Sequence, residues 1–186
     1  MKGFFFANGK QGSGKTLLMV KHLVDEHLEY PHKKIFSNTP LFNVGEYQFI
    51  TFDKNKAGDE NKMSILEQLD SDPNYFNHSI MLLDEIHLYL NSLDFFKNNN
   101  RALQTFFSQL RKRDILLLAT SQYFHDIDIR VRSQALNSFE MEHIYKDLFV
   151  ATTCRVLRYD YIEEEVTRLK LSMYYDYFDT NYLILE

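Results

Sequence analysis

Three short stretches of the chain are mostly apolar and lack polar alternation: residues 3–7, Ser79–Leu83 and residues 115–119. Runs of this length and composition are typical of strands that are buried on both faces of a parallel sheet. Residues 34–37 and 47–52 predict two further strands. Together these segments predict a mainly parallel central sheet.

Helical periodicity occupies much of the chain between these strands. Residues 15–30 predict a helix that Pro31 ends, and four apolar residues lie on one of its faces: Leu17, Val20, Val24 and Leu28. A second helix is predicted near residues 63–69, and a third runs from an asparagine cap at residues 98–100 to about Arg113. The third helix carries an amphipathic stripe formed by Leu103, Phe106, Phe107 and Leu110.

The alternation of buried strands and helices predicts an α/β fold with helices on both faces of the sheet. Alternating apolar and polar residues at 148–153 and 166–173 add antiparallel strands toward the C-terminus. A polar stretch at residues 53–62 predicts an exposed loop. The sequence contains no repeat or linker, and its 186 residues favour a single domain over residues 1–186.

Composition narrows the classes of function. The chain has 21 Lys and Arg against 26 Asp and Glu, a net charge of −5, which excludes a polybasic nucleic-acid coat but not a local basic stripe. A single cysteine, Cys154, excludes an internal disulfide and a cysteine zinc cluster. The longest apolar run is too short for a transmembrane segment, so we expect a soluble protein in the reducing cytoplasm.

The segment GKQGSGKT fits the phosphate-loop pattern G-x-x-x-x-G-K-[ST] at every position, between a predicted strand and a predicted helix. Glycines let backbone N–H groups converge on phosphate oxygens, and the helix N-terminus adds its positive dipole end. Lys15 would reach the β- and γ-phosphates, and the Thr16 hydroxyl would coordinate Mg²⁺. The alternative is an ordinary glycine turn. The predicted nucleotide-binding residues are Gly9, Lys10, Gln11, Gly12, Ser13, Gly14, Lys15 and Thr16.

Two carboxylates, Asp84 and Glu85, directly follow the buried strand Ser79–Leu83. The carboxyl ends of parallel strands meet at the ligand-binding edge of such a sheet. Asp84 is therefore expected to face Mg²⁺ held at Thr16, which leaves Glu85 to orient and deprotonate a water molecule. The alternative is a solvated Asp-Glu pair at the end of a strand.

Polar and basic residues near residues 115–119 suggest two further roles. Gln122 follows that strand, so it is placed to contact the γ-phosphate or the attacking water, unless it is an ordinary turn residue. Arg111 and Arg113 precede the strand, at the opposite edge of the sheet. Either could reach a γ-phosphate only in a neighbouring subunit, and Arg111 is the stronger candidate; the alternative is a solvated helix end.

The segments that carry these features resemble the FtsK–HerA superfamily of ring-forming DNA-pumping ATPases. More narrowly, they resemble its zonula occludens toxin-like and viral genome-packaging branch. The matching segments are NGKQGSGKT from Asn8, IFSNTP from Ile35, IMLLDEIHLY from Ile80, FSQLRKRDILLLATSQ from Phe107, IDIRVR from Ile127 and YFDT from Tyr177. The resemblance implies a P-loop NTPase fold of the RecA/ASCE type.

The resemblance also implies roles for single residues. Lys15 and Thr16 would bind nucleotide and metal, Asp84 would bind Mg²⁺, and Glu85 would be the catalytic base. Gln122 would act as a sensor, and Arg111 would complete the site of the adjoining subunit. Arg130 and Arg132 follow Asp126 and Asp128, and local ion pairing is their expected role.

The implied function is an ATP-hydrolysing motor that translocates double-stranded DNA, with viral genome packaging as the leading role. Its partners would be DNA, further copies in a ring, expected to be a hexamer, and a capsid vertex or a membrane-associated assembly protein. The implied location is the host cytoplasm or the virion. Lys33 and Lys34, or Lys54, Lys56 and Lys62 in the polar loop, are candidate DNA contacts; the alternative is a solvated charged loop. The alternatives are a zonula occludens toxin-like morphogenesis or extrusion ATPase and a nucleotide-kinase-type phosphotransferase.

Overall fold

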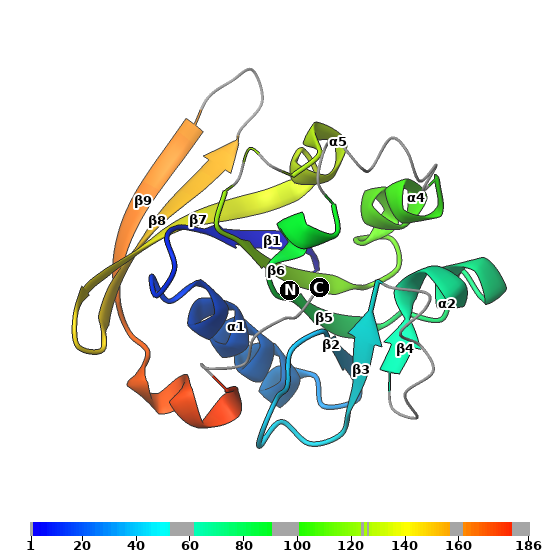
Figure 1. The fold of residues 1–186 in the computed structure, drawn as a ribbon, viewed down its shortest axis with the longest axis horizontal. Helices are drawn as coiled ribbons and strands as arrows, with labels where there is room; N and C mark the ends of the chain where they lie inside the picture. Colours follow the sequence, from blue (N-terminus) through cyan, green and yellow to red (C-terminus); the bar gives the residue numbers. More distant parts are fainter. Residues whose placement is uncertain are drawn as a thin grey trace.

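A computed structural model describes residues 2–52, 62–90, 101–123, 125, 127–156 and 162–179. In this part of the chain nine strands form one sheet in the order β4-β3-β2-β5-β6-β1-β7-β8-β9 (Figure 1). The strands are β1 (Gly3–Asn8), β2 (Lys34–Ser37), β3 (Tyr47–Thr51), β4 (Lys62–Ser64), β5 (Ser79–Leu83), β6 (Leu116–Ser121), β7 (Ala135–Tyr145), β8 (Leu148–Val156) and β9 (Ile162–Lys170). The helical elements are α1 (Lys15–Glu29), α2 (Ile65–Ser71), η2 (Ile86–Leu88), α4 (Arg101–Gln109), α5 (Ile129–Arg132) and η4 (Ser172–Tyr177).

The sheet is parallel from β4 to β7 and becomes antiparallel only where β7, β8 and β9 pair. The predicted mainly parallel sheet with antiparallel strands toward the C-terminus is therefore confirmed. In Figure 1 the last strands extend away from the parallel part. Among the described helices, none combines the length and hydropathy that crossing a lipid bilayer requires.

Successive residues of the central strands enter two hydrophobic cores on opposite faces of the sheet. Phe4 and Phe6 of β1 belong to the core under α2 and α4, whereas Phe5 and Ala7 belong to the core under α1. A strand that is covered on both faces has no solvent side. This explains the absence of polar alternation in these segments and confirms that helices cover both faces.

The helices differ from the prediction at the start of α2, in the exposure of Leu28, and at the end of α4, which is Gln109 and not about Arg113. The segment predicted as a helix at 63–69 first forms the short strand β4, and α2 begins only after Ser64, whose hydroxyl accepts a hydrogen bond from the Glu67 N–H. Leu28 is predicted on the buried face of α1, but it is 76% exposed, whereas Glu26 in the same turn is buried. The predicted stripe of α4 is buried, while its predicted cap at residues 98–100 and the loop at 53–61 lie outside the described residues.

Strand β7 is absent from the prediction although it is the longest described strand. Of its residues only Phe139 and Met141 are buried, so its sequence lacks both an apolar run and a sustained alternation. Its position depends on pairing with β1 on one side and β8 on the other. β1 lies far from β7 in the sequence, so local pattern alone could not identify this pairing.

His22 of α1 yields a prediction about stability. Burial, assisted by Lys21 and opposed by Asp25, lowers the pKa of His22 from 6.5 to about 4. Its ring packs against Phe139 with centroids 5.6 Å apart. The unfolded chain binds a proton at His22 more readily than the folded chain does. The contribution of neutral His22 to stability is therefore complete above pH 6.5 and is lost as the pH falls to about 4.

We expect the free energy of unfolding to fall by up to about 3 kcal/mol across this pH window through His22 alone. Urea unfolding at a series of pH values measures the effect. His22→Gln should flatten the pH dependence between 4 and 6.5, whereas His32→Gln, at an exposed position, should not. An unchanged slope in His22→Gln would contradict the assignment.

Candidate nucleotide-binding and catalytic site

The phosphate loop joins β1 to α1 and contains glycines at positive φ. Gly9, Gly12 and Gly14 have φ values of 143°, 74° and 88°, which residues with a side chain rarely adopt. Gly14 is the N-cap of α1, and no side chain caps the helix. The first N–H groups of α1 are therefore directed toward the loop, where they can bind an anion.

Strands β7 and β8 pack directly against two of these glycines. A Cβ atom on Gly9 would lie 2.5 Å from the carbonyl oxygen of Met141, and one on Gly14 would lie 2.6 Å from Cδ1 of Phe149. Both distances are too short for any residue other than glycine. Strands β7 and β8 of the antiparallel part of the sheet therefore pack against the phosphate loop and support it.

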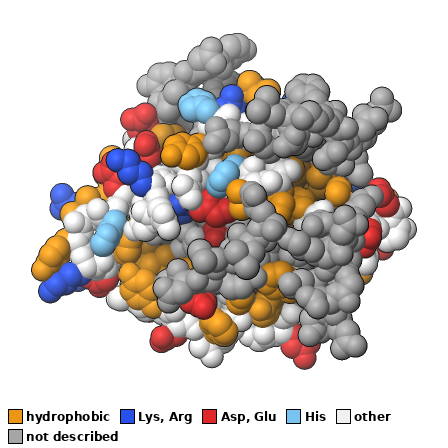
Figure 2. Space-filling view, viewed as in Figure 1, with side chains coloured by type: hydrophobic (Ala, Val, Ile, Leu, Met, Phe, Trp, Pro, Cys, Tyr) orange, Lys and Arg blue, Asp and Glu red, His pale blue; other side chains and the backbone are white. Residues whose placement is uncertain are grey.

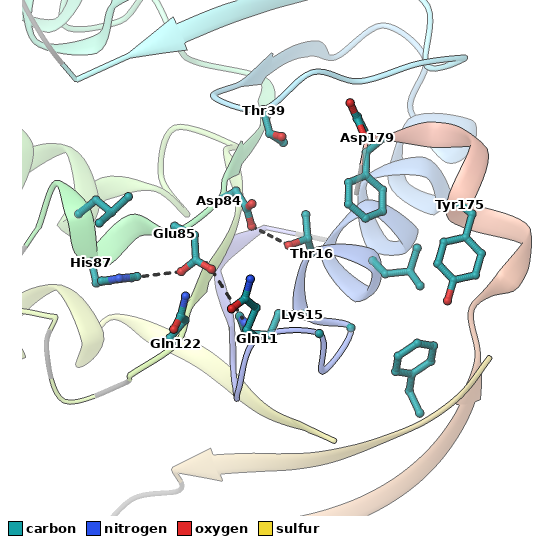
Figure 3. A pocket seen from close by; sticks show the side chains of 16 residues that line it. Gln11, Lys15, Thr16, Thr39, Asp84, Glu85, His87, Gln122, Tyr175 and Asp179 are labelled. Carbon is teal, nitrogen blue, oxygen red and sulfur yellow. Dashed lines mark hydrogen bonds and ion pairs between the residues drawn. The ribbon is translucent and has the colours of Figure 1, made fainter. Parts of the chain in front are cut away.

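A cavity of about 400 Å³ lies beside the loop (Figure 3). Lys15 is 5% exposed, and its ammonium group donates a hydrogen bond of 3.1 Å to the Lys10 carbonyl oxygen. The same nitrogen lies 4.0 Å from Oε1 of Glu85. The cavity brings together most of the predicted site residues: Gln11, Gly12, Gly14, Lys15, Thr16, Asp84, Glu85 and Gln122.

The end of β5 meets the start of α1 through the side chains of Asp84 and Thr16. The Thr16 hydroxyl donates to Oδ1 of Asp84 over 2.8 Å, and the Thr120 hydroxyl donates to the same oxygen over 2.6 Å. In the described residues no group of three or more His, Cys, Asp or Glu side chains could hold a metal ion. Mg²⁺ needs no such cage, because it binds through one or two carboxylates together with phosphate oxygens and water. Asp84 and Thr16 fit that donor set.

Glu85 occupies a strained and partly buried position. Its φ of 48° is left-handed, and its N–H donates to the Thr120 hydroxyl over 3.0 Å. Burial raises the pKa of Glu85, and the adjacent Asp84 raises it further, while Lys15, His87 and a hydrogen bond from Gln122 oppose both effects. Strain of this kind at a non-glycine residue points to a functional constraint.

Three residues complete the site although the sequence assigned them no role. Asn38, after β2, forms two hydrogen bonds with the Asp84 backbone: its amide donates to the carbonyl oxygen over 2.8 Å and its Oδ1 accepts from the N–H over 2.7 Å. Thr120 holds the backbone of Glu85, and His87 places Nδ1 3.3 Å from Oε2 of Glu85 and 3.1 Å from the Ser121 hydroxyl. A signal for Asn38 and Thr120 was available, because both are polar residues at the carboxyl ends of parallel strands.

Arg111 lies at the opposite edge of the sheet from the phosphate loop. A Cβ atom on Gly3, at the start of β1, would lie 3.2 Å from Cγ of Arg111. The loop begins beyond the other end of that strand, about 16 Å away at the rise of an extended chain. Arg111 is exposed, and no hydrogen bond or ion pair joins its guanidinium to the described part of the chain. It therefore lies on the surface far from the site of its own chain.

The neighbouring basic residues differ from Arg111. Arg113 donates to Gln109 Oε1 and to the Pro73 carbonyl oxygen, so it is engaged within its own chain. Arg130 pairs with Asp128 over 2.9 Å, as predicted, and Asp126 lies outside the described residues.

Lys33, one of the candidate DNA contacts, is neither available to DNA nor solvated. Its side chain is 3% exposed and forms ion pairs with Glu26 at 2.9 Å and Asp114 at 3.6 Å. Lys34 is exposed, with its ammonium 5.4 Å from the centre of the Tyr75 ring. Lys54 and Lys56 lie outside the described residues.

A phosphate loop after β1 and an acidic pair after the nearby parallel strand β5 define the fold as that of a P-loop NTPase. The family model described as "Schlafen group 3, DNA/RNA helicase domain" matches residues 2–169, and the chain belongs to this family. No curated protein sequence matches the chain.

Solved structures share the fold. The N-terminal domain of zonular occludens toxin from Neisseria meningitidis is similar with a TM-score of 0.71 and 16% identity, over 96% of this chain and 100% of that one. The genome packaging NTPase B204 from Sulfolobus turreted icosahedral virus 2, in complex with sulfate, is similar with a TM-score of 0.58 and 11% identity, over 87% of this chain and 94% of that one. The predicted resemblance to this branch of P-loop NTPases is confirmed.

The role of Asn38 leads to a prediction. Asn38→Ala would leave both the N–H and the carbonyl oxygen of Asp84 without their partner, in a partly buried position. We expect the free energy of unfolding to fall by about 1–3 kcal/mol. Asn74→Ala, at an exposed position, is the matched control and should change it by less than about 0.5 kcal/mol. Equal effects in denaturant titrations would contradict the role of Asn38.

Proposed function

We propose that the chain is an ATP-hydrolysing motor that moves double-stranded DNA as a ring of identical subunits, with viral genome packaging as its role. The observation that carries the proposal is the convergence of Lys15, Thr16, Asp84 and Glu85 on one cavity. A glycine turn without function would not explain a left-handed Glu85 whose N–H is held by the Thr120 hydroxyl.

The chemistry follows from the geometry. The N–H groups of the loop and the Lys15 ammonium bind the β- and γ-phosphates, and Thr16 and Asp84 hold Mg²⁺. When bound, Mg²⁺ neutralises charge that develops on the phosphate oxygens. A water oxygen forms a bond to the γ-phosphorus while the bond to the bridging oxygen breaks and ADP leaves; the water proton passes to Glu85. Its raised pKa makes Glu85 a stronger base for that transfer.

Gln122 and His87 contribute by their contacts with Glu85. Nδ1 of His87 lies 3.3 Å from Oε2 of Glu85, and Gln122 lies beside the same carboxylate (Figure 3). Gln122 also lines the cavity, where it can orient the attacking water. Positioning of this kind reduces the entropy cost of the reaction.

Movement of nucleic acid is supported by the comparisons rather than by a charged surface. The family description names a DNA/RNA helicase domain, and the similar protein B204 is described as a genome packaging NTPase. On the face drawn in Figure 2, Lys and Arg side chains lie mostly toward β7, β8 and β9 and are interspersed with acidic ones. The greater likeness of fold to the zonular occludens toxin domain keeps morphogenesis or extrusion as the second candidate.

The function is tested by phosphate release, measured with and without double-stranded DNA over a range of protein concentrations. We expect release to rise with both, because DNA and a neighbouring subunit are parts of the active assembly. Glu85→Gln should bind ATP but release phosphate at least about 100-fold more slowly, since it removes the base. Release that depends on neither variable would contradict the motor, and a phosphorylated nucleoside product would favour the phosphotransferase.

The proposed role of Arg111 in a neighbouring site requires mixed assemblies. Arg111→Ala should slow hydrolysis by about 10³-fold or more, the effect typical of an arginine supplied in trans. Adding Glu85→Gln subunits should restore part of the activity, because each mixed interface can then contain one intact Glu85 and one intact Arg111.

Lys112→Ala is the matched control, since Lys112 is the exposed neighbour of Arg111. Alone it should hydrolyse ATP at nearly the unmodified rate, and adding Glu85→Gln subunits should only dilute its activity. Absence of recovery at every ratio of Arg111→Ala to Glu85→Gln, with assembly intact, would count against an arginine in trans.

A further inference from the structure

The cavity beside the phosphate loop has two ends of different character. Glu85, His87 and Gln122 lie around one end, and aromatic side chains line the other: Phe149 of β8, Tyr175 of η4 and Phe178 directly after η4. In Figure 3, Tyr175 and Asp179 lie on the opposite side of Thr16 from Glu85 and His87. The proposed hydrolysis uses only the polar end, so the aromatic end needs a separate explanation.

The order of groups along a nucleoside triphosphate shows which end of the cavity would hold the phosphates and which the nucleoside. If Asp84 and Glu85 act on the γ-phosphate and the loop binds the β-phosphate, the nucleoside must extend away from the acidic pair. The remaining direction within the cavity leads past Thr16 toward Tyr175 and Phe178. This step rests on the proposed function.

We propose that Tyr175 and Phe178 form a binding site for the nucleobase, which stacks on their rings with Phe149 behind it. Tyr175 is 41% exposed although it faces the cavity, so its ring is not needed to fill a core. Phe149 is fixed, because it packs against Gly14 and stacks on His143 with ring centroids 4.9 Å apart. Nucleobases stack on aromatic side chains through their π-faces, whatever their pattern of hydrogen-bonding groups.

The segment that presents Tyr175 is held by its neighbours and not by Tyr175 itself. The Phe42 N–H donates to the Tyr177 carbonyl oxygen over 2.8 Å, and the Asn43 amide donates to that of Asp176 over 3.0 Å. The Tyr174 hydroxyl donates to Oδ1 of Asp25 in α1 over 3.3 Å. These contacts hold the η4 segment against α1 and against residues 42–43, and they do not depend on the ring of Tyr175.

The experiment compares the binding of two ligands by calorimetry in the presence of Mg²⁺: ATP and inorganic tripolyphosphate, which has the phosphates but no base. We expect Tyr175→Ala to lower the affinity for ATP at least about fivefold, which is the lower bound for the loss of one stacked ring. The affinity for tripolyphosphate should not change. Tyr175→Leu keeps an apolar side chain in case alanine disturbs the segment, and it should weaken ATP in the same way. Met173 lies on the same segment and is 70% exposed, so Met173→Ala is the control and should change the affinity for neither ligand.

Three results would overturn the base site. They are unchanged ATP affinity in Tyr175→Leu, an equal loss for both ligands, and an equal effect of Met173→Ala. If the unmodified chain binds both ligands but loss of the Tyr175 ring does not change the affinity for ATP, the base site fails while the proposed function stands. If the unmodified chain binds neither ligand, the proposed function fails and the base site fails with it.

Discussion

The site depends on one carboxylate oxygen. Oδ1 of Asp84 accepts hydrogen bonds from Thr16 and Thr120, and the Asp84 backbone is held by Asn38. Four chain segments that are distant in sequence thus meet at one edge of the sheet. Because buried polar groups are costly unless they are paired, these bonds define how β2, β5, β6 and α1 must be placed relative to one another. The phosphate loop and the acidic pair are aligned as a consequence.

The antiparallel strands extend this arrangement beyond the parallel sheet. Main-chain atoms of Met141 and the ring of Phe149 approach Gly9 and Gly14 so closely that a side chain at either glycine would clash. The loop is thereby held between α1 and the β7–β8 pair. The same Phe149 lines the cavity, so one residue both supports the phosphate loop and contributes to the proposed base site.

The two edges of the sheet have different exposures and therefore different possible roles. The edge with Asp84 surrounds a cavity, whereas the edge with Arg111 presents a guanidinium on the surface without a partner in the described part of the chain. Near that second edge, Lys33 and Glu26 form a buried ion pair, and the partly exposed Asp114 lies 3.6 Å from Lys33. Removing Lys33 or Glu26 would leave an unpaired buried charge, so this pair is better explained by stability than by contact with DNA.

The sequence by itself determined the phosphate loop, the acidic pair and the strands β1, β5 and β6, because each depends on local pattern: a glycine-rich turn, a doubly buried apolar run or a helix start. It also placed Arg111 and Gln122 at opposite edges through the direction of the parallel strands. Only the tertiary structure decided the position of β7, the burial of Lys33, the exposure of Leu28 and the support that Asn38, Thr120 and His87 give to the acidic residues. The same holds for the aromatic end of the cavity, where β8 and η4 approach a loop that lies more than a hundred residues earlier in the sequence. These features arise from contacts between distant segments, which no local period of apolar and polar residues records.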